Sequence, residues 1–341
     1  MNALNPLFAQ ARTVRNTSPE SRSMSTIAPR RLRQHFFDHI PIVVLALLCL
    51  VATLSSDRFL SYSNLTNVLL QASVMAVVTI GMTYVIIGGG FDLSVGSVVA
   101  LSGCIAAEVL LKYGIVAGVL AGALAGVAVG IVNGVVVAKL RVSPFIATLG
   151  TMVLVRGVVL LLTQGTPVVG DEGLGDTFTA LGSGGFLGLP ILVWIAIVLA
   201  LIFSWVLHQT AYGTRVFAVG GNPEASFLSG LPVQRITISL YAICGLTAGL
   251  AGVLLAARLQ SGQPSAGEFY ELTSIAAVVL GGAALQGGEG KLYKSMVGVL
   301  IMVILANALN LLGVDSYWQR VAIGVVIIAA AAVDQLRRKR S

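Results

Sequence analysis

Long apolar segments alternate with short polar segments along most of this chain. The apolar segments cover residues 40–56, 66–88, 94–111, 115–138, 144–163, 189–207, 236–256, 273–286, 296–313 and 318–334. A helix needs roughly 20 residues to cross the hydrocarbon core of a bilayer, and most of these segments are close to that length. The pattern therefore predicts an all-α polytopic membrane protein with about ten transmembrane helices.

The basic residues between the segments predict the orientation of the chain. An even number of spans puts both termini on one side, and cytoplasmic loops carry an excess of Lys and Arg. If the termini are cytoplasmic, the basic residues of the cytoplasmic loops are Lys139, Arg141, Arg215, Arg235, Lys291 and Lys294, and those of the outer loops are Arg58, Lys112 and Arg258. The larger share then lies inside, so we expect both termini in the cytoplasm.

The two ends of the chain differ from the apolar part. Residues 1–36 are rich in Ser, Arg and Pro and show no apolar period, which is typical of a disordered segment. We expect a disordered cytoplasmic leader over 1–36, a transmembrane domain over 37–336 with its longest cytoplasmic loop at 208–235, and a basic cytoplasmic tail at 337–341.

The composition narrows the possible functions. Hydrophobic residues make up 56% of the chain and charged residues 10%, whereas soluble domains have about 25% charged residues. No separate soluble domain fits between the spans. The net charge of +7 comes largely from the two tails, and no basic face with interleaved aromatics accompanies it, so we expect membrane lipid and no nucleic acid as a partner.

Few residues have the pattern of a metal or cofactor site. Cys49, Cys104 and Cys244 each lie in an apolar run and form no CxxC pair. His35 and His39 are four residues apart, and we favour a role at the membrane interface over metal binding for them. The sequence predicts no metal site, no cofactor and no catalytic residue.

Two glycine-rich interruptions break the spanning pattern. The first covers residues 86–97 and contains Gly88, Gly89, Gly90, Asp92, Ser94 and Gly96, and the second covers residues 280–291 and contains Gly281 and Gly282. Irregular backbone at membrane depth requires cover by protein or by a watery cavity, and paired interruptions point to the pathway of a transporter. We therefore expect discontinuous helices along a translocation path, although an ordinary glycine turn at the interface is the alternative for both.

Asp92 is the most informative charged residue of the first interruption. A carboxylate within the bilayer costs a few kcal/mol and marks a functional or structural partner. Its position predicts a cap on the next helix, with its oxygens accepting from the amides around Val95 and Gly96. A proton relay and direct substrate contact are the alternatives.

The loop 208–235 predicts a short isolated helix. Asn222 suits the N-cap, Pro223 the first helical position and Glu224 the first turn, and Gly230 suits the position after the end. Phe227 and Leu228 give this helix an apolar side. A helix of about two turns is marginal alone in water, so it should pack against either its own bundle or a cytoplasmic partner.

Several blocks of sequence stand out in order along the chain: Gly81-Met82-Thr83 with Gly90-Phe91-Asp92-Leu93-Ser94-Val95-Gly96-Ser97; Val219-Gly220-Gly221-Asn222-Pro223-Glu224-Ala225; Ile275-Ala276-Ala277-Val278-Val279-Leu280-Gly281-Gly282; Gly287-Gly288-Glu289-Gly290; and Asn310-Leu311-Leu312-Gly313-Val314. With these blocks the chain resembles, from about residue 40 to 337, the ribose-type permeases of bacterial ABC importers for simple sugars. Glu224-Ala225 with Gly230 is also similar to the Glu-Ala-Ala-x-x-x-Gly coupling motif of ABC permeases, with Ser226 in place of the second Ala.

The resemblance implies a permease of the bacterial cytoplasmic (inner) membrane that imports a ribose-like pentose or related monosaccharide. It implies three partners: cytoplasmic ABC ATPase subunits, a periplasmic or extracellular sugar-binding protein, and a second permease copy in a homodimer or heterodimer. The residues that it assigns to ATPase coupling are Asn222, Pro223, Glu224, Ala225, Phe227, Leu228 and Gly230.

The chain has no phosphate-binding loop of its own. Gly290-Lys291 follows Leu285 and precedes Leu292, so G-x-x-x-x-G-K-[ST] fails at two positions. An ATPase in trans is therefore expected. An ion-coupled secondary carrier for a small polar solute is the alternative function, and an intramembrane enzyme is a third.

A neutral polyhydroxylated cargo would suit amides, hydroxyls and aromatic rings. The candidate substrate contacts are Gln71, Thr83, Tyr84, Asn133, Arg156 and Asn307. Hydrogen bonds between helices are the competing interpretation for the polar members of this set, and snorkelling or ion pairing is the competing interpretation for Arg156.

Overall fold

The computed structural model describes residues 28–170 and 173–338. Most of the predicted leader and the end of the basic tail lie outside these residues. The chain divides into residues 1–40 and 41–341, and the first unit contributes only the start of helix α1 to the described part. That helix begins at Ala28, inside the segment predicted to be disordered. All contacts below concern the second unit.

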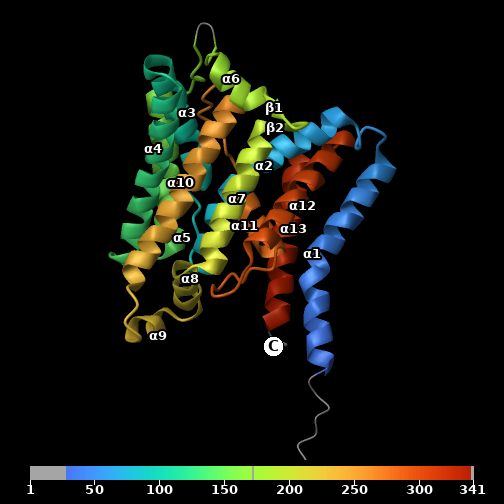
Figure 1. Cartoon of the computed structure of the whole chain (residues 1–341), viewed down its shortest axis with the longest axis vertical. Coiled ribbons are helices and arrows are strands. Elements are labelled where there is room, and N and C mark those ends of the chain that lie inside the picture. Colours follow the sequence, from blue (N-terminus) through green and yellow to red (C-terminus); the bar gives the residue numbers. More distant parts are fainter. Residues whose placement is uncertain (1–27, 171–172, 339–341) are drawn as a thin grey trace, which may run out of the picture. The chain divides into compact units, whose positions relative to one another are not determined.

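The described residues form thirteen helices and one two-stranded hairpin (Figure 1). The first half contains α1 (Ala28–Ser55), α2 (Tyr62–Ile87), α3 (Val95–Tyr113), α4 (Ile115–Ala138), α5 (Pro144–Thr163) and α6 (Asp176–Ser183). The hairpin strands β1 (Gly185–Phe186) and β2 (Leu189–Pro190) follow. The second half contains α7 (Ile191–Gln209), α8 (Ala211–Gly221), α9 (Pro223–Leu228), α10 (Val233–Leu259), α11 (Tyr270–Leu280), α12 (Leu292–Leu311) and α13 (Ser316–Arg338).

Each of the ten predicted apolar segments coincides with a helix. Within residues 28–170 and 173–338, seven helices are long and apolar enough to cross a membrane, namely α2, α3, α4, α5, α7, α10 and α12. Helix α11 has only 11 residues and ends at Leu280, six residues before the predicted end of its segment. Helices α6 and α8 and the hairpin were not predicted, because α6 and the hairpin are too short to give an apolar period and α8 carries Thr214 and Arg215 among its apolar residues.

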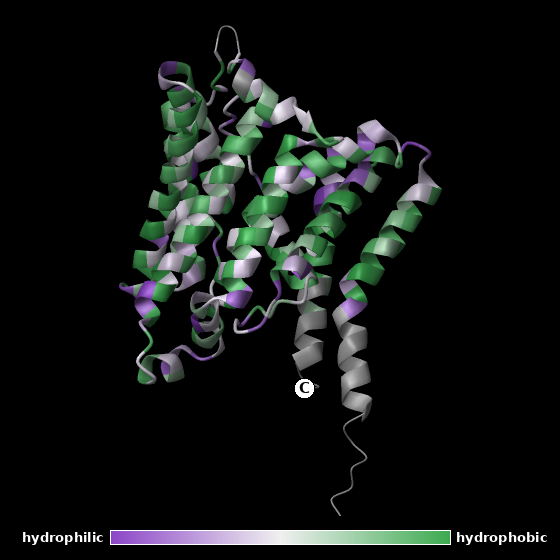
Figure 2. Ribbon diagram, viewed as in Figure 1, coloured by the Kyte–Doolittle hydropathy of each residue, from purple (hydrophilic) through white to green (hydrophobic). Residues whose placement is uncertain are grey.

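The spanning helices differ in how much of their surface the rest of the chain covers. Within the most apolar 18 residues of each helix, 83% of the residues of α2 and 72% of those of α3 are buried, whereas only 17% of those of α5 are buried. Large apolar side chains such as Leu124 and Leu161 cover the outer faces of α4 and α5, and these helices are correspondingly hydrophobic in Figure 2. Helices α2, α3 and α10 therefore form the interior, and the outer helices present apolar side chains suited to lipid.

Glycines set the distance between α4 and α10. Five glycines recur at every fourth position of α4: Gly118, Gly122, Gly126, Gly130 and Gly134. A Cβ on Gly126 would lie 2.2 Å from the carbonyl oxygen of Gly245 on α10, and a Cβ on Gly245 would lie 2.1 Å from the carbonyl oxygen of Gly126. The two backbones are thus in direct contact, which is the close packing that small residues allow between membrane helices.

Candidate functional site

The helix predicted in the loop 208–235 is α9. Asn222 is its N-cap and accepts a hydrogen bond from the amide of Ala225 at 2.9 Å, and Pro223 occupies the first turn. At the other end, the amide of Gly230 donates to the carbonyl of Phe227 and the amide of Leu231 donates to the carbonyl of Ser226. This is the Schellman motif, and Gly230 takes the positive φ of +82° that the motif requires. The predicted caps are therefore confirmed.

The apolar side chains of α9 do not pack on the bundle. Phe227 is 70% exposed and Leu228 is 79% exposed, whereas Ser226 is buried. Helix α9 does contact α8 and α10, so it lies against its own bundle on the side of Ser226, and Phe227 and Leu228 lie on its uncovered side. A short, well-capped helix with exposed Phe and Leu at its end is a suitable surface for another protein.

The preceding helix α8 ends against both glycine-rich interruptions. A Cβ on Gly220 would lie 1.8 Å from the carbonyl oxygen of Ile87 and 2.8 Å from the amide nitrogen of Gly288. The amide of Gly288 itself donates to the carbonyl of Ile87 at 2.8 Å, and a Cβ on Gly287 would lie 2.8 Å from Cα of Gly89. Three segments far apart in the sequence therefore meet through backbone atoms alone. We call this contact the glycine junction.

A cavity of about 200 Å³ opens beside the glycine junction. Its lining includes residues 88–90 of the first interruption, Gly220 and Pro223 around the start of α9, Tyr241 of α10 and Pro144 at the start of α5. The cavity therefore joins the α8–α9 region to the elements on which the predicted path depends. The second interruption contributes Gln286 to the lining, and Gly281 packs against the backbone of Lys294 and Ser295 in α12.

Asp92 forms a buried polar cluster with Ser94 and Asn133. Asp92 is 1% exposed, and its Oδ1 accepts from the amide of Ser94 at 2.9 Å, from Oγ of Ser94 at 2.6 Å and from Nδ2 of Asn133 at 3.4 Å. The predicted N-cap role of Asp92 is wrong, because Ser94 is the N-cap of α3 and Asp92 accepts from Ser94 instead of from Val95 and Gly96. The carboxylate lies two residues before the N-cap Ser94, so it reaches the N-cap amide in an Asx turn.

The Asp92 cluster joins α3 to α4 and α10. Asn133 also donates to Oγ of Ser94 at 2.9 Å, and the Tyr241 hydroxyl donates to the carbonyl of Phe91 at 3.0 Å. Asn133 lies five residues before the end of α4 and Tyr241 lies eight residues after the start of α10. At 1.5 Å per residue, α3 therefore begins about 8–12 Å inside the ends of its neighbours.

A substitution distinguishes hydrogen bonding from charge chemistry at Asp92. Asn at this position keeps Oδ1 as an acceptor for Ser94 and removes the carboxylate. Because the hydrogen bonds to Oδ1 are the contacts that Asp92 makes here, Asp92→Asn should keep transport within about threefold of wild type, a difference below about 1 kcal/mol. Transport by membranes with equal amounts of each protein would measure this, and complete loss with Asn would favour a charged or proton-carrying role.

Most other candidate substrate contacts bond to their own bundle. Thr83 donates to the carbonyl of Thr79 at 2.7 Å, and Tyr84 donates to the carbonyl of Phe203 at 2.5 Å. Asn307 exchanges two hydrogen bonds with Asn64, and Gln71 is exposed on α2. The structure therefore favours a helix-packing role for Thr83, Tyr84 and Asn307.

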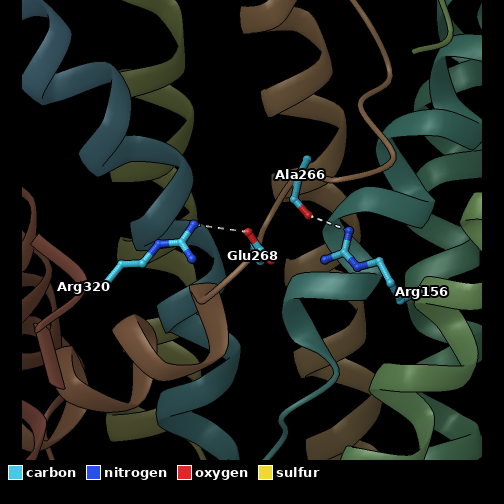
Figure 3. A network of polar contacts seen from close by, with 4 residues as sticks. All are labelled: Arg156, Ala266, Glu268 and Arg320. Atoms are coloured by element: carbon cyan, nitrogen blue, oxygen red, sulfur yellow. Dashed lines mark hydrogen bonds and ion pairs between the residues drawn. The ribbon is translucent and has the colours of Figure 1, made fainter. Parts of the chain in front are cut away.

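Arg156 differs from the other candidates because it reaches an irregular segment. Its Nη1 donates to the carbonyl of Pro264 at 2.6 Å. It also donates to the carbonyl of Ala266 at 3.0 Å (Figure 3). Both acceptors lie in the connection between α10 and α11, which the sequence pattern indicated as an outer loop. Glu268, in the same connection, forms an ion pair with Arg320 of α13, with 3.7 Å between Oε2 of Glu268 and Nη2 of Arg320. The sequence showed that Glu268 lies in a loop, but it did not show that Arg320 lies beside Glu268.

Comparison with known proteins gives consistent results. Residues 64–331 match the family model described as "Branched-chain amino acid transport system / permease component". The chain is 46% identical over 299 residues to the ribose import permease protein of Escherichia coli (strain K12), which covers 87% of this chain and 93% of the relative. It is 44% identical over 304 residues to the ribose import permease protein of Bacillus subtilis (strain 168), covering 88% and 92%.

A third relative is named for the transport of a different sugar. The L-arabinose transport system permease protein of Escherichia coli (strain K12) is 39% identical over 299 residues, which covers 87% of this chain and 90% of the relative. No solved structure matches the chain.

Proposed function

The chain belongs to the family of branched-chain amino acid transport system permease components, and on this premise we propose that it is the membrane-spanning subunit of an ATP-driven importer for a simple sugar. Relatives named for ribose and L-arabinose import align over most of both chains. A ribose-like pentose or related monosaccharide is the substrate class that these relatives support. The protein is a multi-pass protein of the bacterial inner membrane.

The single observation that supports the mechanism is the exposed end of α9, which follows the glycine junction directly in the chain. Phe227 and Leu228 are available to a partner, and Gly220, three residues before α9 begins, contacts the backbone of both interruptions. Movement of a partner bound to α9 would therefore act on the junction directly. A permease of this kind needs only two conformations whose balance its partners shift.

The partners follow from this mechanism. Cytoplasmic ATPase subunits bind α9 through Asn222, Pro223, Glu224, Ala225, Phe227, Leu228 and Gly230, and a sugar-binding protein delivers the cargo on the other side. A second permease copy completes the assembly. The topology that suits it has about ten spans, with α1, α11 and α13 added to the seven long apolar helices, and with both termini in the cytoplasm.

The docking role of α9 can be tested by placing charge on its exposed apolar end. The double variant Phe227→Asp/Leu228→Asp should fold and insert normally, because neither side chain packs on the bundle, but burying two unpaired carboxylates in an interface costs several kcal/mol. We expect loss of the ATPase from the purified complex. Glu224→Arg, which reverses the charge in the first turn of α9, should weaken the association as well.

Leu187→Asp is the matched control for this experiment. Leu187 is 76% exposed and lies at the turn of the β1–β2 hairpin, far from α9 in the sequence. ATPase recovery with this variant should equal that of wild type. Undiminished recovery with the α9 variants would contradict the docking assignment.

A further inference from the structure

The connection between α10 and α11, residues 260–269, runs along α3 instead of leaving the bundle. Gly262 packs at one point of α3, where its Cβ would lie 2.7 Å from Cα of Cys104. Gly267 packs at another, where its Cβ would lie 2.4 Å from the carbonyl oxygen of Gly96. The two contact points are eight residues apart on α3, which corresponds to about 12 Å along the helix axis.

This connection ends deep within the bundle. Gly96 is the second residue of α3, and α3 begins inside the ends of α4 and α10, as the Asp92 cluster shows. Helix α11 starts at Tyr270, directly after this point, and its 11 residues extend about 16 Å, roughly half the hydrocarbon thickness. The segment 261–269 and α11 thus follow one another as an irregular half and a helical half of one crossing.

Charged side chains gather on the exposed side of this irregular half. Arg156 reaches it from α5 and Arg320 reaches it from α13, on opposite sides of Glu268 (Figure 3). The side chain of Glu268 is 66% exposed and that of Arg320 is 57% exposed. Glu271, in the first turn of α11, lies close to Gly96. A Cβ built on Gly96 would lie 2.5 Å from Oε2 of Glu271.

Lipid is an unsuitable neighbour for this surface. Exposed charges and irregular backbone within a membrane occur where protein or a water-filled cavity covers them. The neighbouring outer faces of α4 and α5 carry large apolar side chains, so the charged surface contrasts with the faces suited to lipid. The rest of the described chain leaves Glu268 and Arg320 largely uncovered, so of these two kinds of cover a water-filled cavity suits the segment 261–269 and its arginines.

We propose that the segment 261–269, with Arg156, Glu268, Glu271 and Arg320, lines the aqueous pathway and contacts the transported sugar, an assignment that rests on the proposed function. Carboxylates accept hydrogen bonds from sugar hydroxyls, and guanidinium groups donate to them. Both bonds of Arg156 to the backbone use Nη1, and a guanidinium has five N–H donors. Phe269, 37% exposed beside Arg320, adds an apolar ring face.

The first test measures whether water reaches the segment. Ser265 is exposed, so Ser265→Cys in membrane vesicles should react with a charged, membrane-impermeant methanethiosulfonate. Leu161→Cys on α5 is the control, since Leu161 is 81% exposed but lies on an apolar face. A thiol in lipid stays protonated and unreactive, so the rate at Ser265→Cys should exceed that at Leu161→Cys by at least about tenfold. Equal rates at the two positions would overturn the proposal.

The second test measures sugar uptake by the complex with its ATPase and binding protein, with D-ribose and L-arabinose as probes. Arg156→Gln and Glu268→Gln should each raise KM about tenfold or more, the cost of a lost hydrogen bond to a charged group, while ATPase co-purification stays normal. Glu108→Gln, which removes an exposed ion pair with Lys112 on α3, should leave KM unchanged. Unchanged KM in the first two variants would contradict sugar contact.

The two tests separate this inference from the proposed function. If the chain does not import these sugars, the wild-type complex takes up neither probe, whereas labelling of Ser265→Cys still reports the aqueous pathway. If the chain imports sugar by another route, wild-type uptake is normal and Ser265→Cys stays unlabelled. Each result identifies the claim that fails.

Discussion

Gly220→Ala should abolish sugar uptake, whereas Gly221→Ala at the next position should leave it close to wild type. The Cβ of an alanine at 220 would lie 1.8 Å from the carbonyl oxygen of Ile87, so backbone must move to admit it. The displaced atoms belong to the contact between α8 and the first interruption. Forcing atoms into a packed interior costs about 1–3 kcal/mol or more, and here the cost falls on the connection to α9.

Gly221→Ala is a closely matched control because it makes the same chemical change one residue away. The nearest heavy atom to a Cβ at 221 is Cα of Gly288 at 3.9 Å, which is ordinary van der Waals contact. Uptake should be measured at equal membrane levels, together with ATP hydrolysis by the complex. Equal uptake by the two variants would contradict the role of the glycine junction in coupling.

Gly126→Leu should destabilise the folded protein more than any substitution discussed above. Its Cβ alone would lie 2.2 Å from the carbonyl oxygen of Gly245 and 2.8 Å from Cα of Gly249. The side chain would therefore separate α4 from α10, and the van der Waals contact that drives helix association in membranes would be lost. We expect a loss of about 3 kcal/mol or more, with poor recovery of folded protein in detergent.

Gly150→Leu on α5 is the control for Gly126→Leu. No heavy atom lies within 4 Å of a Cβ at position 150, and leucine is a better helix former than glycine by about 0.5–1 kcal/mol. The control should therefore be as stable as wild type or slightly more stable. Thermal unfolding of both variants in the same detergent measures the difference, and similar midpoints would rule out the glycine contact as a main source of stability.

Local sequence signals predicted much of this structure. The long apolar segments predicted ten helices, because a helix that is surrounded by lipid consists of a continuous run of apolar residues. Asn222, Pro223 and Gly230 gave both ends of α9, because capping depends on residues adjacent in sequence. The prediction for Asp92 was wrong, because several adjacent polar residues precede α3 and the sequence does not show that Ser94 is the N-cap and that Asp92 bonds to Ser94.

Contacts between distant segments could not be predicted in the same way. Glycines at 89, 220 and 287 appear in the sequence as three separate turns, and only the fold shows that they share one contact. The connection 260–269 is polar, like an outer loop, so composition alone placed it at the surface. Its descent along α3 depends on Gly262 and Gly267 matching Cys104 and Gly96, which is a property of tertiary packing.

The central claim is that partner ATPase subunits, and not an ion gradient, drive sugar uptake through this chain. Measuring which energy source drives uptake tests this claim most directly. Proteoliposomes should contain either this chain alone or the chain with its ATPase and binding protein, and accumulation of labelled D-ribose and L-arabinose should be followed under an ion gradient or with ATP. The proposed mechanism predicts uphill accumulation only for the full complex with ATP. Accumulation by the chain alone, driven by a proton or sodium gradient, would contradict it.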